Sequence, residues 1–93
     1  MGLSEYRRRL AARKQTADQA YQDRRDDIGA LLDTLGQEVK MHAEYAQKEG
    51  INWGHAGSLG HVKELLVETL AFLAQRDESD IEEYLDDLRA GRG

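Results

Sequence analysis

The chain has 93 residues, 40% of them hydrophobic and 33% charged, and it contains neither cysteine nor proline. A chain of this length corresponds to one small domain, and the lack of cysteine excludes disulfide bonds, thiolate zinc sites and cysteine nucleophiles. The first residues form no apolar signal segment and no stretch approaches about 18 apolar residues, so we expect a cytoplasmic protein with no membrane partner.

The charge is distributed unevenly along the chain. The net charge of −5 combines +4 over residues 1–25 with −9 over the remainder, and residues 77–87 hold seven acids and no base. An acidic remainder opposes binding to phosphates, so direct DNA binding is not expected. The two ends are instead suited to attract each other, within one chain or between copies.

The first expected helix runs from about residue 4 to about residue 48. Its composition favours helix throughout, and the apolar positions of its second half step alternately by four and three residues, as in a packed helical seam. This seam consists of Ile28, Leu32, Leu35, Val39, His42 and Ala46. A weaker upstream stripe is out of phase with it, and a polar run at residues 22–27 separates the two. Residues 22–27 therefore mark a bend in one long helix or a break between two helices.

Glycines make residues 49–57 a turn, and a second helix is expected at about 58–76 with Ser58 as its cap. Eight large apolar residues between positions 59 and 73 mark it as the most buried helix. Ser79 and Glu82 have the spacing of a capping box, which starts a short third helix at about 80–90.

These elements predict an all-α fold in a single domain spanning residues 1–93. The short connector makes the first two helices an antiparallel hairpin, with the third helix beside it. A hairpin of thin helices cannot close a core alone, and the long first helix extends beyond the second. We therefore expect a homo-oligomeric bundle.

One segment carries more unusual residues than packing needs, namely residues 51–64. Trp53 is the only tryptophan and could stack on a flat group, while His55, Ser58 and His61 could donate hydrogen bonds to an anion at the start of the second helix. Arginines from the basic N-terminal run could clamp its phosphates. The predicted ligand-binding set is Trp53, His55, Ser58, His61, Arg8 and Arg9.

Three other interpretations of these residues stay open. In the first, Trp53 plugs the end of the hairpin, the glycines only make the turn, and the arginines form a solvated face. In the second, a metal ion lies between two pairs of side chains, Glu38 with His42 and His61 with Glu64. In the third, the residues act in catalysis, but nothing orients an imidazole next to a nucleophile. We expect no enzymatic activity, no metal and no cofactor.

The string INWGHAGSLGHV at residues 51–62, followed by a leucine-rich amphipathic helix, resembles a motif in small helical proteins of phages and mobile elements. The resemblance covers about residues 50–74 and transfers no functional residue. It implies a setting in which small helical oligomers bind host proteins or sequester nucleotide signals of host immunity.

Three functional hypotheses follow from the sequence. In the first, the protein is a non-enzymatic homo-oligomer that sequesters a small anionic, nucleotide-like ligand near Trp53 and His61. In the second, it is a protein-interaction module, or an inhibitor of a host defence complex, that acts through the acidic third helix. In the third, it is a purely structural coiled-coil oligomer that uses neither the turn residues nor the acidic helix for binding.

Overall fold

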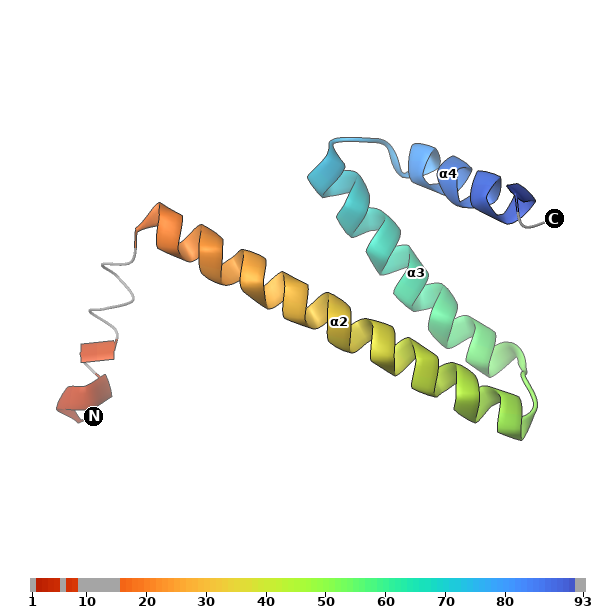
Figure 1. Ribbon diagram of the computed structural model, residues 1–93, viewed down its shortest axis with the longest axis horizontal. Helices are drawn as coiled ribbons and strands as arrows, with labels where there is room; N and C mark the ends of the chain where they lie inside the picture. The colour runs from red at the N-terminus through yellow and green to blue at the C-terminus, as the bar shows by residue number, and fades with distance from the viewer. Residues whose placement is uncertain (1, 6, 9–15, 92–93) are drawn as a thin grey trace. The chain divides into compact units, whose positions relative to one another are not determined.

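The computed structural model describes residues 2–5, 7–8 and 16–91, and this part of the chain is helical without any strand (Figure 1). The helices are α2 (Ala17–Glu49), α3 (Trp53–Ala74) and α4 (Glu78–Gly91), and residues 3–5 and 7–8 are helical as well. The predicted all-α fold is confirmed. The chain divides into two compact units, Met1–His42 and Ala43–Gly93.

Helix α2 begins at Ala17, so the predicted continuous helix from residue 4 is wrong. Thr16 caps the helix: its side-chain oxygen accepts a hydrogen bond from the Gln19 amide (3.1 Å), and the Gln19 side chain accepts one from the Thr16 amide (3.2 Å). This reciprocal capping box satisfies amide groups that a helix N-terminus leaves unpaired. The predicted helix over residue 6 and residues 9–15 lies outside the described residues.

Residues 22–27 neither break α2 nor start a new helix, because α2 runs as one element from Ala17 to Glu49. At about 1.5 Å per residue, its 33 residues span about 50 Å. The charged residues at 22–27 have exposed side chains, so this run interrupts the apolar stripe but not the backbone. The helix ends before Gly50, whose φ of +93° lies in the region that favours glycine.

Helix α3 ends through a left-handed residue, Gln75, with φ 56° and ψ 48°. The next amide, from Arg76, donates back to the Ala71 carbonyl at 3.0 Å and closes the C-terminus. Helix α4 then begins at Glu78. Ser79 therefore lies inside its first turn, and the predicted cap at Ser79 is wrong by two positions, because the residue that precedes the helix is Asp77. Glu82, the other residue of that predicted box, forms an ion pair with α3 instead.

Helices α3 and α4 pack against each other around a small core. Val67 and Ala71 from α3 contact Ile81 from α4, and the partly buried Leu85 packs against this cluster. The Lys63 ammonium lies 3.0 Å from a Glu82 carboxylate oxygen and links the two helices at the edge of the core. This cluster fixes α4 on α3.

The large side chains of α3 are mostly exposed, although α3 was predicted to be the most buried helix. It contributes two of the four buried hydrophobic residues, Val67 and Ala71. Its exposed large residues are Trp53, Leu59, Leu65, Leu66, Leu70, Phe72 and Leu73. Even so, no helix in the described ranges is long and apolar enough to cross a bilayer. An apolar composition predicted burial, but in its own unit the buried part of α3 is the side that packs against α4.

Candidate functional site

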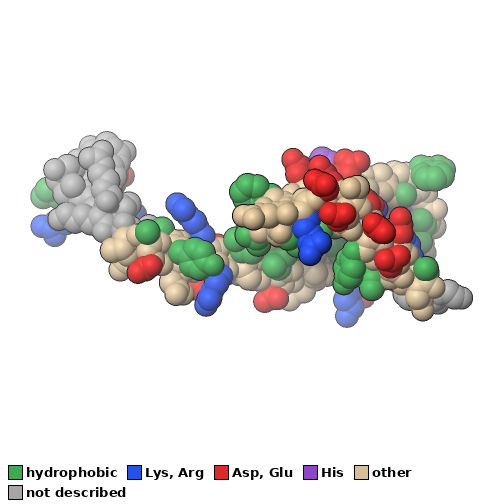
Figure 2. Space-filling model, turned by 90° about the horizontal axis from the view of Figure 1, so that it is seen from above, with side chains coloured by type: hydrophobic (Ala, Val, Ile, Leu, Met, Phe, Trp, Pro, Cys, Tyr) green, Lys and Arg blue, Asp and Glu red, His purple; other side chains and the backbone are tan. Residues whose placement is uncertain are grey.

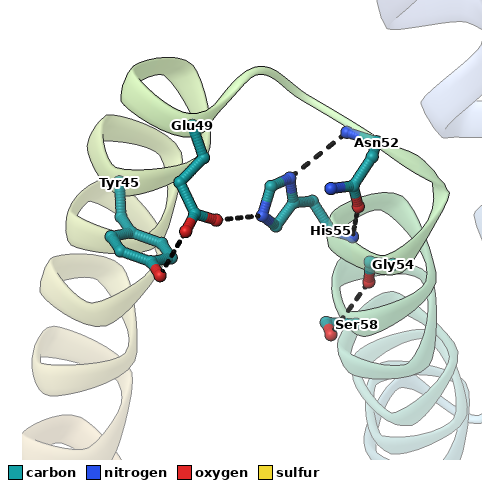
Figure 3. Close-up of polar contacts among 6 residues, drawn as sticks. All are labelled: Tyr45, Glu49, Asn52, Gly54, His55 and Ser58. Carbon is teal, nitrogen blue, oxygen red and sulfur yellow. Dashed lines mark hydrogen bonds and ion pairs between the residues drawn. The ribbon is translucent and has the colours of Figure 1, made fainter.

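The N-terminus of α3 is organised by Asn52 and His55. Asn52 has an extended backbone, and its side-chain oxygen accepts a hydrogen bond from the His55 amide at 3.1 Å. In return, Nδ1 of His55 accepts a hydrogen bond from the Asn52 amide at 3.2 Å (Figure 3). The imidazole thus takes the part that a glutamate or glutamine plays in an ordinary capping box. Helix α3 therefore begins at Trp53, five residues before the predicted start at Ser58.

This cap fixes the tautomer of His55. An imidazole nitrogen accepts a hydrogen bond only through a free lone pair, so Nδ1 carries no proton in this arrangement. The hydrogen of the neutral ring lies on Nε2, which is 3.2 Å from a carboxylate oxygen of Glu49. The ring thereby joins the last turn of α2 to the first turn of α3 across the glycine-containing connector (Figure 3).

Tyr45 completes the cluster from the α2 side. Its hydroxyl donates to the other carboxylate oxygen of Glu49 at 2.6 Å, and its ring meets the His55 ring edge-on, with centroids 6.4 Å apart and an interplanar angle of 82°. The hydrogen bond from Tyr45, aided by the hydrogen bond from His55, lowers the pKa of Glu49 despite partial desolvation. The same hydrogen bond and the carboxylate charge raise the pKa of Tyr45.

Gly54 fits closely beneath the cap. A Cβ atom added at this position would lie 3.1 Å from the side-chain oxygen of Asn52. This contact is tight, so any larger residue would displace the oxygen that caps α3. The glycine is therefore explained by the Asn52 cap, without a ligand.

Ser58 also has a local partner. It lies in the second turn of α3, where its hydroxyl donates to the Gly54 carbonyl at 3.2 Å. The predicted helix start at Ser58 would have left the amides that follow it open to an anion, but these amides lie inside the helix rather than at its N-terminus. The anion position predicted there is wrong, because the chain becomes helical at Trp53.

Trp53 does not plug the turn. It is the first residue of α3 and is 90% exposed, so the plug interpretation is wrong. Its side chain borders an open depression of about 370 Å³ that is lined by Ile51, Asn52, Trp53 and Ala56. The lining is largely apolar, and Asn52 is the polar residue among the four. This surface has the chemistry to receive a flat or apolar group.

The structure places the predicted ligand-binding set in two parts of the chain. Trp53, His55, Ser58 and His61 lie within the first three turns of α3, where His61 is exposed. Arg8 is exposed in the other unit, and Arg9 lies outside the described residues. Of the four residues on α3, His55 and Ser58 have structural roles, which leaves Trp53 and His61 as the side chains directed to solvent.

Sequence reasoning missed Tyr45, Glu49 and Asn52. Two signals were present: Asn52 stands three residues before a side chain with an acceptor atom, and Tyr45 and Glu49 have the i, i+4 spacing of contacting helix residues. The metal alternative gains no support, because the described residues contain no group of three or more potential ligands among His, Cys, Asp and Glu.

Comparison with known proteins gives no relative: no family model, no curated protein and no solved structure matches this chain.

Proposed function

We propose that the protein is a non-enzymatic helical interaction module that works as a homo-oligomer. The observation that carries this proposal is the imbalance between buried and exposed hydrophobic residues. Among the described residues, four hydrophobic side chains are buried, all on α2, α3 and α4, whereas 18 large hydrophobic residues are exposed. Monomeric proteins rarely expose contiguous apolar surface on this scale.

Association between copies would cover these surfaces. The core of α3 and α4 contains Val67, Ala71 and Ile81, which is little apolar burial for a chain of 93 residues. In an oligomer, α2 and α3 would bury their exposed leucines against other copies. Such an assembly would be the homo-oligomeric hairpin bundle that the sequence predicts. We also propose that the protein is located in the cytoplasm.

The acidic face of α4 is the surface we assign to a partner protein. Acidic side chains crowd the surface over α4 (Figure 2), and the helix carries two acids in its first turn. A basic protein surface would complement this face. In the phage or mobile-element setting that the sequence resemblance implies, the partner would be a host protein.

The test of self-association is native mass spectrometry combined with sedimentation equilibrium, from low to high micromolar concentrations. We expect a mass that is a multiple of the 10.5 kDa chain. A monomer across the whole range would overturn the proposal. For the partner surface, replacing Glu83, Asp86 and Asp87 by lysine should abolish partner binding and leave the oligomer mass unchanged.

A nucleotide-like ligand is the second candidate function, favoured by the exposure of Trp53. Aromatic stacking on a base contributes about 1–3 kcal/mol per base, and the depression beside Trp53 has about the volume of a small-molecule site. Because Trp53 is the only tryptophan, its fluorescence reports binding directly. A nucleotide that quenches this fluorescence and raises the melting temperature, but has no effect on the melting temperature of Trp53→Ala, would support this function. No response to a nucleotide panel would exclude it.

A further inference from the structure

Helix α2 presents an exposed seam between residues 21 and 39 that is apolar except for Arg25. Its positions alternate by four and three residues, which keeps them on one face of the helix. The seam consists of Tyr21, Arg25, Ile28, Leu32, Leu35 and Val39. No residue of α2 between positions 17 and 42 is buried, and Ile28 and Leu32 are 53% and 57% exposed at its centre.

The two flanks of this seam differ in charge. One flank carries Arg24, Leu31 and Glu38, spaced by seven residues, with a base at one end and an acid at the other. The opposite flank carries Gln22, Gly29 and Gly36, which have no charge. Apart from Arg25, which lies within the seam itself, the other charged residues of this stretch lie farther from it.

We propose that a second copy of this chain covers the seam and that the two α2 helices lie antiparallel, related by a twofold axis near residue 30. This inference rests on the proposed self-association and specifies its geometry. In an antiparallel pair, each flank meets the same flank of the other helix, whereas in a parallel pair it meets the opposite flank. Only the antiparallel arrangement places Arg24 beside the partner's Glu38, and symmetry makes that pair twice.

This pairing also sets a register in which the apolar positions match. When Arg24 lies opposite the partner's Glu38, Ile28 packs against the partner's Leu32, and Tyr21 packs against the partner's Val39. In the same register, Arg25 lies opposite the partner's Leu35, where its aliphatic part covers apolar surface while its guanidinium reaches solvent.

The twofold axis passes beside Gly29, so this residue would face the partner's Gly29. A Cβ added to Gly29 would meet no atom within 4 Å in the chain, so the space beside it is open to a second backbone. A glycine in the middle of a helix lowers helix stability relative to alanine, and close approach of the partner helix at this point offsets that loss.

The test is a charge-reversal cycle on Arg24 and Glu38, followed by sedimentation equilibrium at low ionic strength. Arg24→Glu alone and Glu38→Arg alone each replace two attractive contacts by two repulsive ones, so the dissociation constant should rise about tenfold. The double variant restores opposite charges and should return the constant to near the wild-type value. Asp33→Arg, on the same helix but away from the seam, is the matched control and should change little.

A distance measurement gives a second, independent readout. Because the chain has no cysteine, Ala17→Cys accepts a single spin label per copy. At about 1.5 Å per residue, an antiparallel dimer centred near residue 30 separates the two labels by about 40 Å, whereas a parallel dimer brings them to about 10 Å. A dimer that shows the short distance and no effect of either single reversal would overturn this inference and leave self-association standing. A wild-type monomer would overturn both.

Discussion

Two regions of the chain form helices for different reasons. Helices α3 and α4 hold each other through Val67, Ala71 and Ile81 and through the ion pair between Lys63 and Glu82. Residues 17–42 of α2 are as regular a helix, yet no side chain among them is buried. The first region is stabilised by packing within the chain. The second region is held by its capping box and its helical hydrogen bonds, and its apolar seam is exposed.

The contrast shows that an amphipathic pattern identifies the apolar face of a helix but does not identify the element that covers this face. Helices that stand alone in water are marginally stable, and most helical stability in proteins comes from the packing of an apolar face. Both α2 and α4 carry an apolar stripe, but only the stripe of α4 packs against a neighbouring helix of its own unit, α3. For residues 17–42, we assign that neighbour to a second copy.

The largest expected effect lies in the packed region. Ile81→Ala removes a 7%-exposed side chain from the cluster between α3 and α4, and we expect it to lower the free energy of unfolding by about 2–3 kcal/mol. Urea unfolding followed by circular dichroism, at a fixed protein concentration, measures the loss. Leu88→Ala is the matched control, because it removes as many carbon atoms from the same helix at a 49%-exposed position. If both variants lose the same free energy, α4 does not depend on this core.

Removing either capping box should have the next largest effect on stability, and the two caps should differ in how much of the chain they affect. Thr16→Ala and Asn52→Ala each remove one cap, which contributes about 1 kcal/mol. Asn52→Ala should lower the unfolding free energy of its whole unit, because this cap also positions His55. Thr16→Ala should instead increase hydrogen exchange only in the first turns of α2, because nothing packed depends on them.

Amide exchange followed by mass spectrometry separates these outcomes residue by residue. Faster exchange throughout α3 after Thr16→Ala would contradict the separation of the two regions. Exchange confined to the first turn of α3 after Asn52→Ala would show that the His55 cluster does not join α2 to α3.

The smallest expected effect is a change in the pKa of Tyr45 when Glu49 is replaced. Because Glu49 raises the pKa of Tyr45, Glu49→Ala should move it down toward the ordinary phenol value, while Glu44→Ala should not. Ultraviolet absorbance of the phenolate measures this, with Tyr45→Phe subtracted to isolate the signal. An unchanged curve in Glu49→Ala would mean that the hydrogen bond between Tyr45 and Glu49 is absent in solution.

The same shifts give the sign of the pH dependence. The raised pKa of Tyr45 means that its bond stabilises the fold below the ordinary phenol pKa of about 10, and that this stabilisation is lost as pH rises through the raised value. The lowered pKa of Glu49 gives stabilisation above the ordinary carboxyl pKa of about 4, lost as pH falls through the lowered value. The cluster is therefore most stabilising between these two limits.

Much of the fold could be predicted from the sequence, because glycines and polar runs punctuate a chain of strong helix formers. The break after Glu49 and the separate final helix follow directly from such signals. The start of α2 was missed although Thr16 and Gln19 form an ordinary capping box, because the favourable composition upstream of Thr16 concealed it. The burial of α3 was overestimated because apolar content does not reveal whether neighbours are available.

Less of the candidate site could be predicted. The unusual residues around Trp53 were recognised, but His55 was assigned to a ligand because the capping-box pattern expects glutamate or glutamine at that position. The roles of Tyr45 and Glu49 depend on how the chain turns at Gly50, which spacing alone does not define. Exposure of Trp53, the feature that favours a binding role, is visible only in three dimensions.

The small core of α3 and α4 has a consequence for how the protein responds to temperature. The heat-capacity change of folding follows the apolar area removed from water, so a chain that buries few side chains by itself has a shallow stability curve. In the proposed assembly, most of this heat-capacity change belongs to association. Cooling and dilution then act on the same equilibrium, since both favour separate copies whose hydrophobic faces are hydrated.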